Sequence, residues 1–256
     1  MNYGLSVRFF VSILKKIRKW YFNRSIVNYF GTNFQKNVLI SYITLPFYKP
    51  YMSHTNSFEA LTAAKIFNEL GYNVDVIFYQ KKKKHLKKYD VIYGFGNVFE
   101  QIITENLNTI MIYYGAGMHV CHQNTKTLER LNDVHNKKGS WLPKSIRYVH
   151  ESWSYQTTIA NAIIALGNNV CSDSYKKHTY VSKVYALQAP YFHRVESDFI
   201  SIRKESSINK FLWFGSSGLI HKGLDLCLEY FKLNKNFELH ICGNILLEKD
   251  FVKVYY

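Results

Sequence analysis

The sequence has few cysteines, and no two of them lie close together. Its 256 residues include four, at Cys121, Cys171, Cys227 and Cys242. Zinc-binding and redox motifs place two cysteines within a few residues of each other, and no such pair occurs here. A disulfide framework or a zinc finger is therefore not expected, and a reducing cytoplasm is the compartment that fits best.

Long apolar runs are also missing. No stretch approaches the roughly 20 apolar residues that a membrane-spanning helix needs. The run Phe9–Leu14 is too short for the hydrophobic region of a signal peptide, although basic residues flank it. We therefore expect no transmembrane helix and a retained N-terminus.

Acidic residues are scarce relative to basic ones. The chain has 18 Asp plus Glu against 33 Lys plus Arg, which gives a formal net charge of +15. This excess favours anionic partners such as phosphates, anionic lipid or nucleic acid, but it does not choose among them. No nucleic-acid motif accompanies the charge, so nucleic acid is not an expected partner. With 47% hydrophobic and 17% aromatic residues, the chain is not a disordered one.

Residues 1–36 form a basic arm, with seven Lys or Arg and no acidic residue. Its apolar residues recur at helix-like spacing: Phe9, Phe10, Ile13, Leu14, Ile17, Trp20 and Tyr21. Two interpretations remain open. The arm is either a helix on an anionic membrane surface or a helix docked on the protein with its basic face in water.

Residues 37–200 alternate between apolar strand patterns and helical patterns. The expected strands are Val38–Leu45, Val74–Tyr79, Val91–Phe95, Thr109–Tyr114 and Ala162–Leu166. Helices are expected after the loop 46–56, over Val98–Leu107, and between Thr125 and Asn161. For the first helix, Asn56 and Glu59 have capping-box spacing and Gly71 stands where a C-terminal glycine belongs. Strands that are apolar on both faces predict a mostly parallel, doubly wound sheet.

The same unit begins again in residues 201–256. A strand at Phe211–Phe214, a loop, a helix containing Leu224 and Leu228, and a strand at Phe237–Ile241 follow in order. The chain ends after about one such unit, which is too little for a domain of this kind to bury its own core. The expected fold class is therefore α/β, with two Rossmann-like doubly wound parallel-sheet domains of which the second is incomplete.

In parallel sheets, ligands bind beyond the carboxyl ends of the strands, so the loops after the strands hold the candidate residues. The last loop contains Gly215, Ser216, Ser217, Gly218, Lys222 and Gly223. Small residues, a following helix N-terminus and a lysine suit a diphosphate, although tight turns also need glycine for steric reasons alone. His119 follows an expected strand and is either functional or an ordinary surface residue. His119 and His122 lack a visible third ligand, so no metal site is expected.

The runs Phe211–Gly215, His221–Leu226 and Leu239–Gly243 resemble, in order and spacing, the start of the donor-binding domain of group 1 (family 4) glycosyltransferases. These enzymes have the two-Rossmann (GT-B) fold. The first half agrees, through the loop His54-Thr55-Asn56 and the segment Ala162–Asn168, which look like the acceptor domain of that family. The resemblance covers the chain from about Asn37 to its end.

The resemblance implies transfer of a sugar from a nucleotide-sugar, with retention of configuration and without a metal or other cofactor. By position, Lys222 neutralises the donor diphosphate and the backbone of Gly215–Gly218 lines it, while His119 is catalytic. The acceptor or cleft candidates are His54, Asn56, Gly117, Gly167 and Asn168, with His54 alternatively capping the following helix. Ser216 stands where many relatives have an arginine, and the family's later glutamate pair is absent because the chain ends first.

The leading hypothesis is therefore a bacterial glycosyltransferase in cell-envelope polysaccharide synthesis. It acts on a glycan or lipid-linked saccharide and is cytoplasmic, peripheral on the inner face of the membrane. The alternative is a truncated, catalytically silent remnant that binds only a membrane surface or a partner.

Residues 1–30 are expected to be largely helical and to bind anionic lipid. Deleting the arm should weaken sedimentation of the chain with vesicles that contain anionic lipid, because its basic residues contact phosphate groups. Added salt should weaken binding of the intact chain, since it screens surface charge. Equal sedimentation with and without the arm would rule out the membrane role.

Overall fold

The computed structural model describes residues 21–49, 54–83, 89–105, 108–192 and 208–256. These residues fall into two compact units. The first combines Met1–His119 with Trp153–Phe192, and the second combines Val120–Ser152 with His193–Tyr256. The domain boundaries expected from the sequence stay a prediction.

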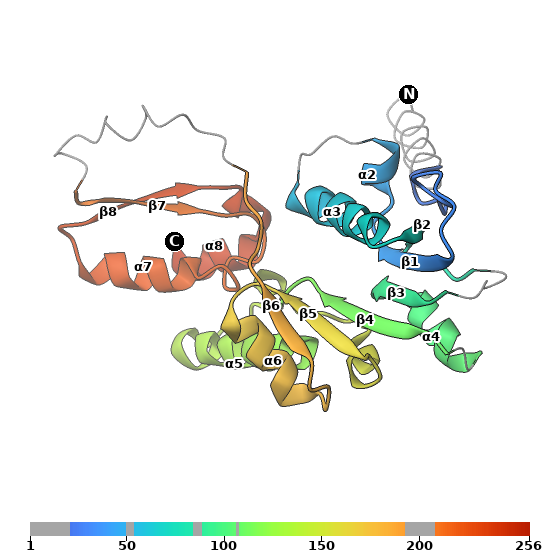
Figure 1. Cartoon of the computed structure of the whole chain (residues 1–256). Coiled ribbons are helices and arrows are strands. Elements are labelled where there is room, and N and C mark those ends of the chain that lie inside the picture. The colour runs from blue at the N-terminus through green and yellow to red at the C-terminus, as the bar shows by residue number, and fades with distance from the viewer. Residues whose placement is uncertain (1–20, 50–53, 84–88, 106–107, 193–207) are drawn as a thin grey trace, which may run out of the picture. The chain divides into compact units, whose positions relative to one another are not determined.

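The first unit contains a six-stranded parallel sheet with the order β2-β1-β3-β4-β5-β6 (Figure 1). Its strands are β1 (Lys36–Tyr42), β2 (Tyr72–Phe78), β3 (Val91–Gly94), β4 (Ile110–Gly115), β5 (Ala162–Leu166) and β6 (Val184–Leu187). The chain builds outward from β1 to β2 and then crosses to the other side of β1 to form β3. This reversal of strand order makes the unit a Rossmann-like α/β structure and confirms the expected fold class for it.

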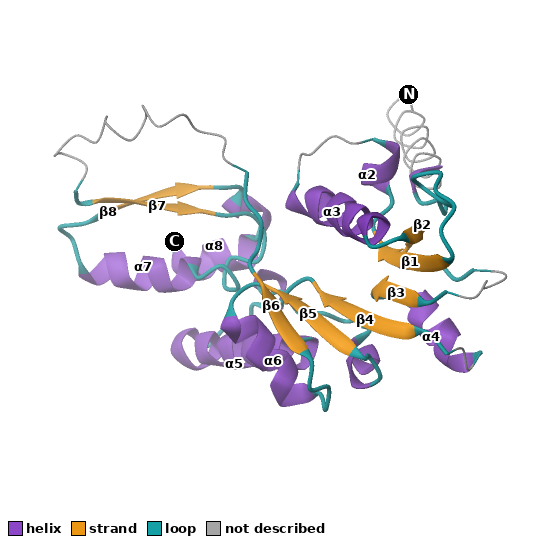
Figure 2. Ribbon diagram, in the orientation of Figure 1, coloured by secondary structure: helices purple, strands orange, loops and turns teal. Residues whose placement is uncertain are grey.

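Helices cover both faces of this sheet (Figure 2). The helices of the unit are α2 (Leu45–Tyr48), α3 (Thr55–Glu69), α4 (Asn97–Thr104) and α6 (Asn169–His178), with a short 3₁₀ helix at Ser154–Thr158. Ala64 of α3 packs in one cluster with Val38, whereas Val98 of α4 packs in another with Leu39. Because neighbouring residues of a strand point to opposite faces, α3 and α4 lie on opposite sides of β1. This explains why three consecutive apolar residues, Val38, Leu39 and Ile40, are all buried in β1.

The N-terminus of α3 is capped by a different residue from the one that the sequence suggested. The N-terminal cap is His54, whose Nδ1 accepts a hydrogen bond from the Asn56 N–H at 3.2 Å. The capping box of Asn56 and Glu59 is therefore wrong. The Glu59 carboxylate instead accepts hydrogen bonds from the hydroxyls of Tyr42 and Tyr114, because this turn of α3 faces the sheet.

Two further features differ from expectation. β1 ends at Tyr42, because Pro46 enters the first turn of α2, where a missing N–H costs nothing. The arm is not helical over residues 23–30, where Ile26 instead pairs with Val76 at the sheet edge. Its first 20 residues lie outside the described part of the chain.

The second unit is built on the parallel strands β7 (Lys210–Phe214) and β8 (Glu238–Cys242). Its helices are α5 (Val120–Lys138), α7 (Leu224–Leu233) and α8 (Lys249–Tyr255), with 3₁₀ helices at Pro143–Ser145 and Ile245–Leu247. The expected order of strand, helix and strand is thus present. Leu131 and Val134 of α5 pack with the apolar residues Trp213, Leu224 and Phe251. Helix α5 therefore supplies part of the apolar core of this unit, whose sheet has two strands among the described residues.

Among the described residues, no helix combines the length and the apolar character that crossing a membrane requires. This agrees with the expectation from the sequence.

Gly94 should be essential for the first unit, because β3 approaches β1 closely at this position. Its φ is +119°, and a Cβ there would lie 2.0 Å from the Ser41 carbonyl oxygen. We expect Gly94→Ala to lower the free energy of unfolding by roughly 3 kcal/mol, through strain and displacement of backbone. Gly117→Ala is the matched control, because a Cβ at Gly117 meets nothing within 4 Å. Equal urea midpoints for the two variants would contradict the close approach.

Candidate functional site

The turn between β7 and α7, residues 215–223, is called here the glycine turn. Its shape is set by backbone hydrogen bonds from Lys222 to Gly218 (2.9 Å) and from Gly223 to Ile220 (3.0 Å). The indole N–H of Trp213 donates to the carbonyl oxygen of Lys222 at 3.1 Å. The turn is therefore fixed to the strand that precedes it.

A buried carboxylate occupies the inner side of the glycine turn. Glu248 is 7% exposed, and its oxygens accept hydrogen bonds from the N–H groups of Gly218 (2.5 Å) and Leu219 (3.3 Å). The carbonyl oxygen of Ser145 accepts from the next two N–H groups, those of Ile220 (2.9 Å) and His221 (3.2 Å). Of these four N–H groups, only that of Gly218 belongs to the Gly215–Gly218 backbone that the sequence assigned to a diphosphate.

With the bonds from Lys222, Gly223 and Leu224, every N–H from residue 218 to residue 224 has an acceptor within the second unit. Within the described residues, the N–H groups of Ser216 and Ser217 have no such acceptor. A phosphate at this turn therefore depends on those two N–H groups and on side chains. The expected backbone contacts of Gly218 and Gly223 stay a prediction.

Lys222 and Ser216 come together at the surface of the turn. The Lys222 Nζ atom lies 2.7 Å from the Ser216 Oγ atom, and both side chains are exposed. Lys222 precedes α7 by two residues, and the helix cap is Gly223 at φ +70°. The ammonium thus lies before the helix start, with a hydroxyl beside it.

A further cation, Arg147, affects His221 in the glycine turn, and the sequence pattern did not indicate it. The pKa of His221 is lowered by partial burial and then by the positive charges of Arg147 and Lys222. Arg147 follows Ser145 by two residues, and the Ser145 carbonyl oxygen accepts from the His221 N–H at 3.2 Å. The backbone of Arg147 therefore lies near the glycine turn, although 68 residues separate it from Gly215 in the sequence (215 − 147). No sequence signal marks Arg147, because it follows neither a strand nor a motif.

His119 is enclosed in the first unit. Its side chain is 3% exposed, stacks on His178 at 4.9 Å between ring centroids, and packs edge-on against Tyr175. Its Nε2 atom lies 3.4 Å from the hydroxyl oxygen of Thr157. These neighbours describe a packed imidazole, and its expected catalytic role stays a prediction.

Gly167 and Asn168 lie together at the carboxyl end of β5. Asn168 caps α6 through its side-chain oxygen, which accepts from the Val170 N–H at 3.0 Å. Both residues line an open pocket of about 880 Å³ that also includes Gln188. His54, Asn56 and Gly117 do not line this pocket.

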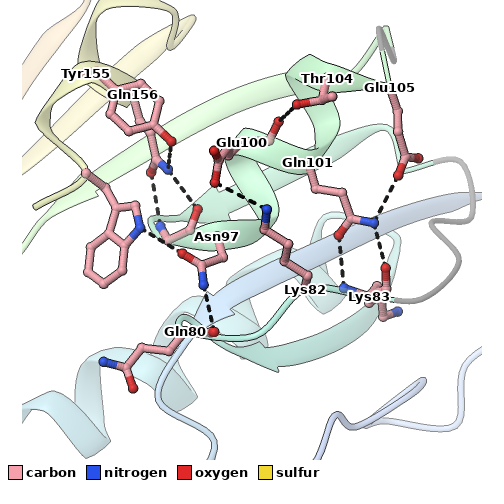
Figure 3. Close-up of polar contacts among 12 residues, drawn as sticks. Gln80, Lys82, Lys83, Asn97, Glu100, Gln101, Thr104, Glu105, Tyr155 and Gln156 are labelled. Carbon is pink, nitrogen blue, oxygen red and sulfur yellow. Dashed lines mark hydrogen bonds and ion pairs between the residues drawn. The ribbon is translucent and has the colours of Figure 1, made fainter.

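Side chains of the segment before β5 bond to the start of α4, next to the point where the strand order reverses (Figure 3). The side-chain amide of Gln156 donates to the Gly96 carbonyl oxygen at 2.8 Å and accepts from the Gly96 N–H at 3.0 Å. Trp153 Nε1 donates to the Asn97 side-chain oxygen at 3.0 Å. The backbone at the start of α4 is therefore engaged by protein side chains where a parallel sheet often binds ligand.

A second pocket of the first unit is mostly apolar. It has a volume of about 520 Å³ and lies between α3 and strands β4 to β6. Its lining includes Phe58 and Ile66 of α3, with Tyr185 and Leu187 of β6. Such a lining fits a hydrocarbon group rather than a phosphate.

No protein-family model, curated protein or solved structure matches this chain. The function is therefore argued from the residues and their geometry.

Glu248 should stabilise the second unit. Glu248→Ala leaves two buried N–H groups without an acceptor, and we expect it to lower the free energy of unfolding by about 3 kcal/mol. The matched control is Glu238→Ala, which removes an exposed carboxylate paired with Lys210 and His240 and should cost about 0.5 kcal/mol. Chemical denaturation measures both. Equal losses would show that Glu248 does not hold the turn.

Proposed function

We propose that the chain belongs to a glycosyltransferase that moves a sugar from a nucleotide-sugar to a glycan or lipid-linked saccharide in cell-envelope polysaccharide synthesis. The observation that carries the proposal is the exposed Lys222 ammonium, 2.7 Å from the Ser216 hydroxyl, beyond the carboxyl end of β7. A parallel strand, a glycine turn and a helix place this pair where such sheets bind ligands. The sequence resemblance supports the same assignment.

In this proposal Lys222 stabilises negative charge on the leaving group. Negative charge grows on the nucleoside diphosphate as it leaves the sugar, and a fixed ammonium beside it lowers the barrier. Ser216 contributes a hydroxyl that donates to a phosphate oxygen once the ligand replaces its contact with Lys222. By the resemblance, the transfer retains configuration and uses side chains rather than a metal ion to neutralise the diphosphate.

The acceptor is assigned to the first unit. The open pocket at Gly167 and Asn168 offers amide groups that hydrogen-bond sugar hydroxyls. The apolar pocket between α3 and β6 favours a lipid-linked acceptor, because its lining and volume suit a hydrocarbon chain. Such an acceptor would bring the protein to the inner face of the cell membrane.

A second candidate is a catalytically silent chain that binds no donor. It is favoured by the internal bonding of the glycine turn, since Glu248 and Ser145 use four consecutive N–H groups that a diphosphate could otherwise accept. The two candidates differ in one measurable property, which is binding of a nucleoside diphosphate.

Lys222→Ala should weaken binding of a nucleoside diphosphate by about 10- to 100-fold, the loss expected for a hydrogen bond to a charged group. Uridine, guanosine and thymidine diphosphates serve as probes, with ligand-observed NMR at millimolar concentration to detect weak binding. The melting temperature should stay nearly unchanged because the ammonium is exposed.

The matched control is Lys232→Ala, which removes an equal charge from the last turn of α7. Failure of the unaltered chain to bind any of the three probes would favour the silent candidate. Equal binding by Lys222→Ala and Lys232→Ala would remove Lys222 from the site.

A further inference from the structure

The segment that carries Arg147 is fixed against the glycine turn at several points. The Ser145 carbonyl oxygen accepts hydrogen bonds from the N–H groups of Ile220 and His221. The Arg147 carbonyl oxygen accepts from Gln123 Nε2 at 3.3 Å and from Thr127 Oγ at 3.4 Å, both on α5. The backbone of Arg147 is therefore held in place within the second unit, and its side chain starts from a fixed point.

The charges at this place are unbalanced. Two basic residues of the second unit have acidic partners, since Lys144 pairs with Asp250 and Arg130 with Asp225. Neither Arg147 nor Lys222 has a carboxylate partner in the part of the chain that the structure describes. Both cations act on the same imidazole, that of His221, whose pKa they lower together with partial burial. The hydrogen bond from the His221 N–H to the Ser145 carbonyl oxygen joins the two segments that carry Lys222 and Arg147. Two like charges on adjoining segments repel each other, and an anion bound by both would reduce this repulsion.

The size and charge of that anion follow from the groups available. A guanidinium presents a planar fork that matches two phosphate oxygens, and an ammonium acts as a point charge. Because the N–H groups from Gly218 to Leu224 already have acceptors, side chains have to neutralise most of the anion. Two cations on separate segments suit two linked phosphoryl groups better than one.

We propose that Arg147 is a second anion-binding residue, and that a diphosphate is held between Arg147 and Lys222 with the Ser216 hydroxyl beside it. The inference deepens the proposed function and rests on it for the identity of the anion as the diphosphate of a nucleotide-sugar. The segment between α5 and β5, which contains Arg147, would then take part in donor binding, and the sequence did not indicate this.

The test is titration of the full 256-residue chain with inorganic pyrophosphate and with uridine diphosphate. Arg147→Gln should weaken pyrophosphate binding about tenfold or more, as loss of a charged hydrogen-bonding partner requires. Lys144→Gln is the matched control, because it removes an equal charge three residues away that is already paired with Asp250. It should change the affinity less than twofold. No pyrophosphate binding by the unaltered chain, or equal binding by the two variants, would overturn the proposal.

A second readout follows the His221 imidazole by NMR as the pH is changed. The charged groups acting on it are Arg147 and Lys222, and both lower its pKa. Arg147→Gln should therefore raise the pKa of His221 toward its usual value of 6.5 in the absence of anion. Pyrophosphate should raise it in the unaltered chain, because a bound anion stabilises the protonated ring. A change in stability alone would produce neither shift, and a His221 titration insensitive to both changes would overturn the proposal.

The outcomes also separate this inference from the proposed function. Pyrophosphate binding that depends on Arg147, without binding of any nucleoside diphosphate, supports the anion site and contradicts nucleotide-sugar transfer. Binding of uridine diphosphate that depends on Lys222 but not on Arg147 supports the proposed function and overturns the role of Arg147.

Discussion

The glycine turn of the second unit depends on the buried carboxylate of Glu248. Glycine-rich turns before a helix bind phosphates mainly through backbone N–H groups, but here two such groups bind a carboxylate of the same chain. Ser145 takes the next two. This arrangement leaves a bound anion with the N–H groups of Ser216 and Ser217 and with side chains, and in the proposed site those side chains are Lys222, Ser216 and Arg147. The site is thus specified by charge on the surface of a turn whose interior is already satisfied.

Regular structure was predictable from the sequence where local patterns decide it. The strands β1 to β5, β7 and β8 were expected within a few residues, because apolar runs bounded by glycine and polar residues are a local signal. Four helices or strands, α2, α6, β6 and α8, were missed, and α2 lies mostly in a segment that was expected to be a loop. The α6 sequence Asn169–His178 is mostly polar, and β6 has only four residues with three of them exposed. Their positions depend on packing of Tyr175 and Val184 with β5, which no local pattern encodes.

The site was predictable only in its glycine turn. Gly215, Ser216 and Lys222 lie within one short motif, so their proximity follows from chain continuity. Glu248 and Gln156 act through contacts with residues 30 or more positions away, as for Glu248 and Gly218 (248 − 218 = 30) and Gln156 and Gly96 (156 − 96 = 60). The segment of Arg147 meets the glycine turn through the Ser145 carbonyl oxygen and the His221 N–H, which are also distant in the sequence. Whether His119 is exposed or buried likewise depends on its packing against α6, which the sequence does not show. Tertiary contacts assign these roles, because a side chain's partner is set by which segments meet.

The net charge of +15 does not by itself locate a binding site, because basic residues are spread along the whole chain and several of them are paired with carboxylates. Lys126 and Lys137 each have a carboxylate within 4 Å, on Glu129 and Glu229, so their charge is partly compensated. A ligand that binds there competes with an existing partner. At Arg147 and Lys222 it meets uncompensated charge and two serine N–H groups without acceptors among the described residues. The proposed anion site therefore rests on two cations that have no carboxylate partner in the described part of the chain, beside two serine N–H groups, and not on the total charge of the chain.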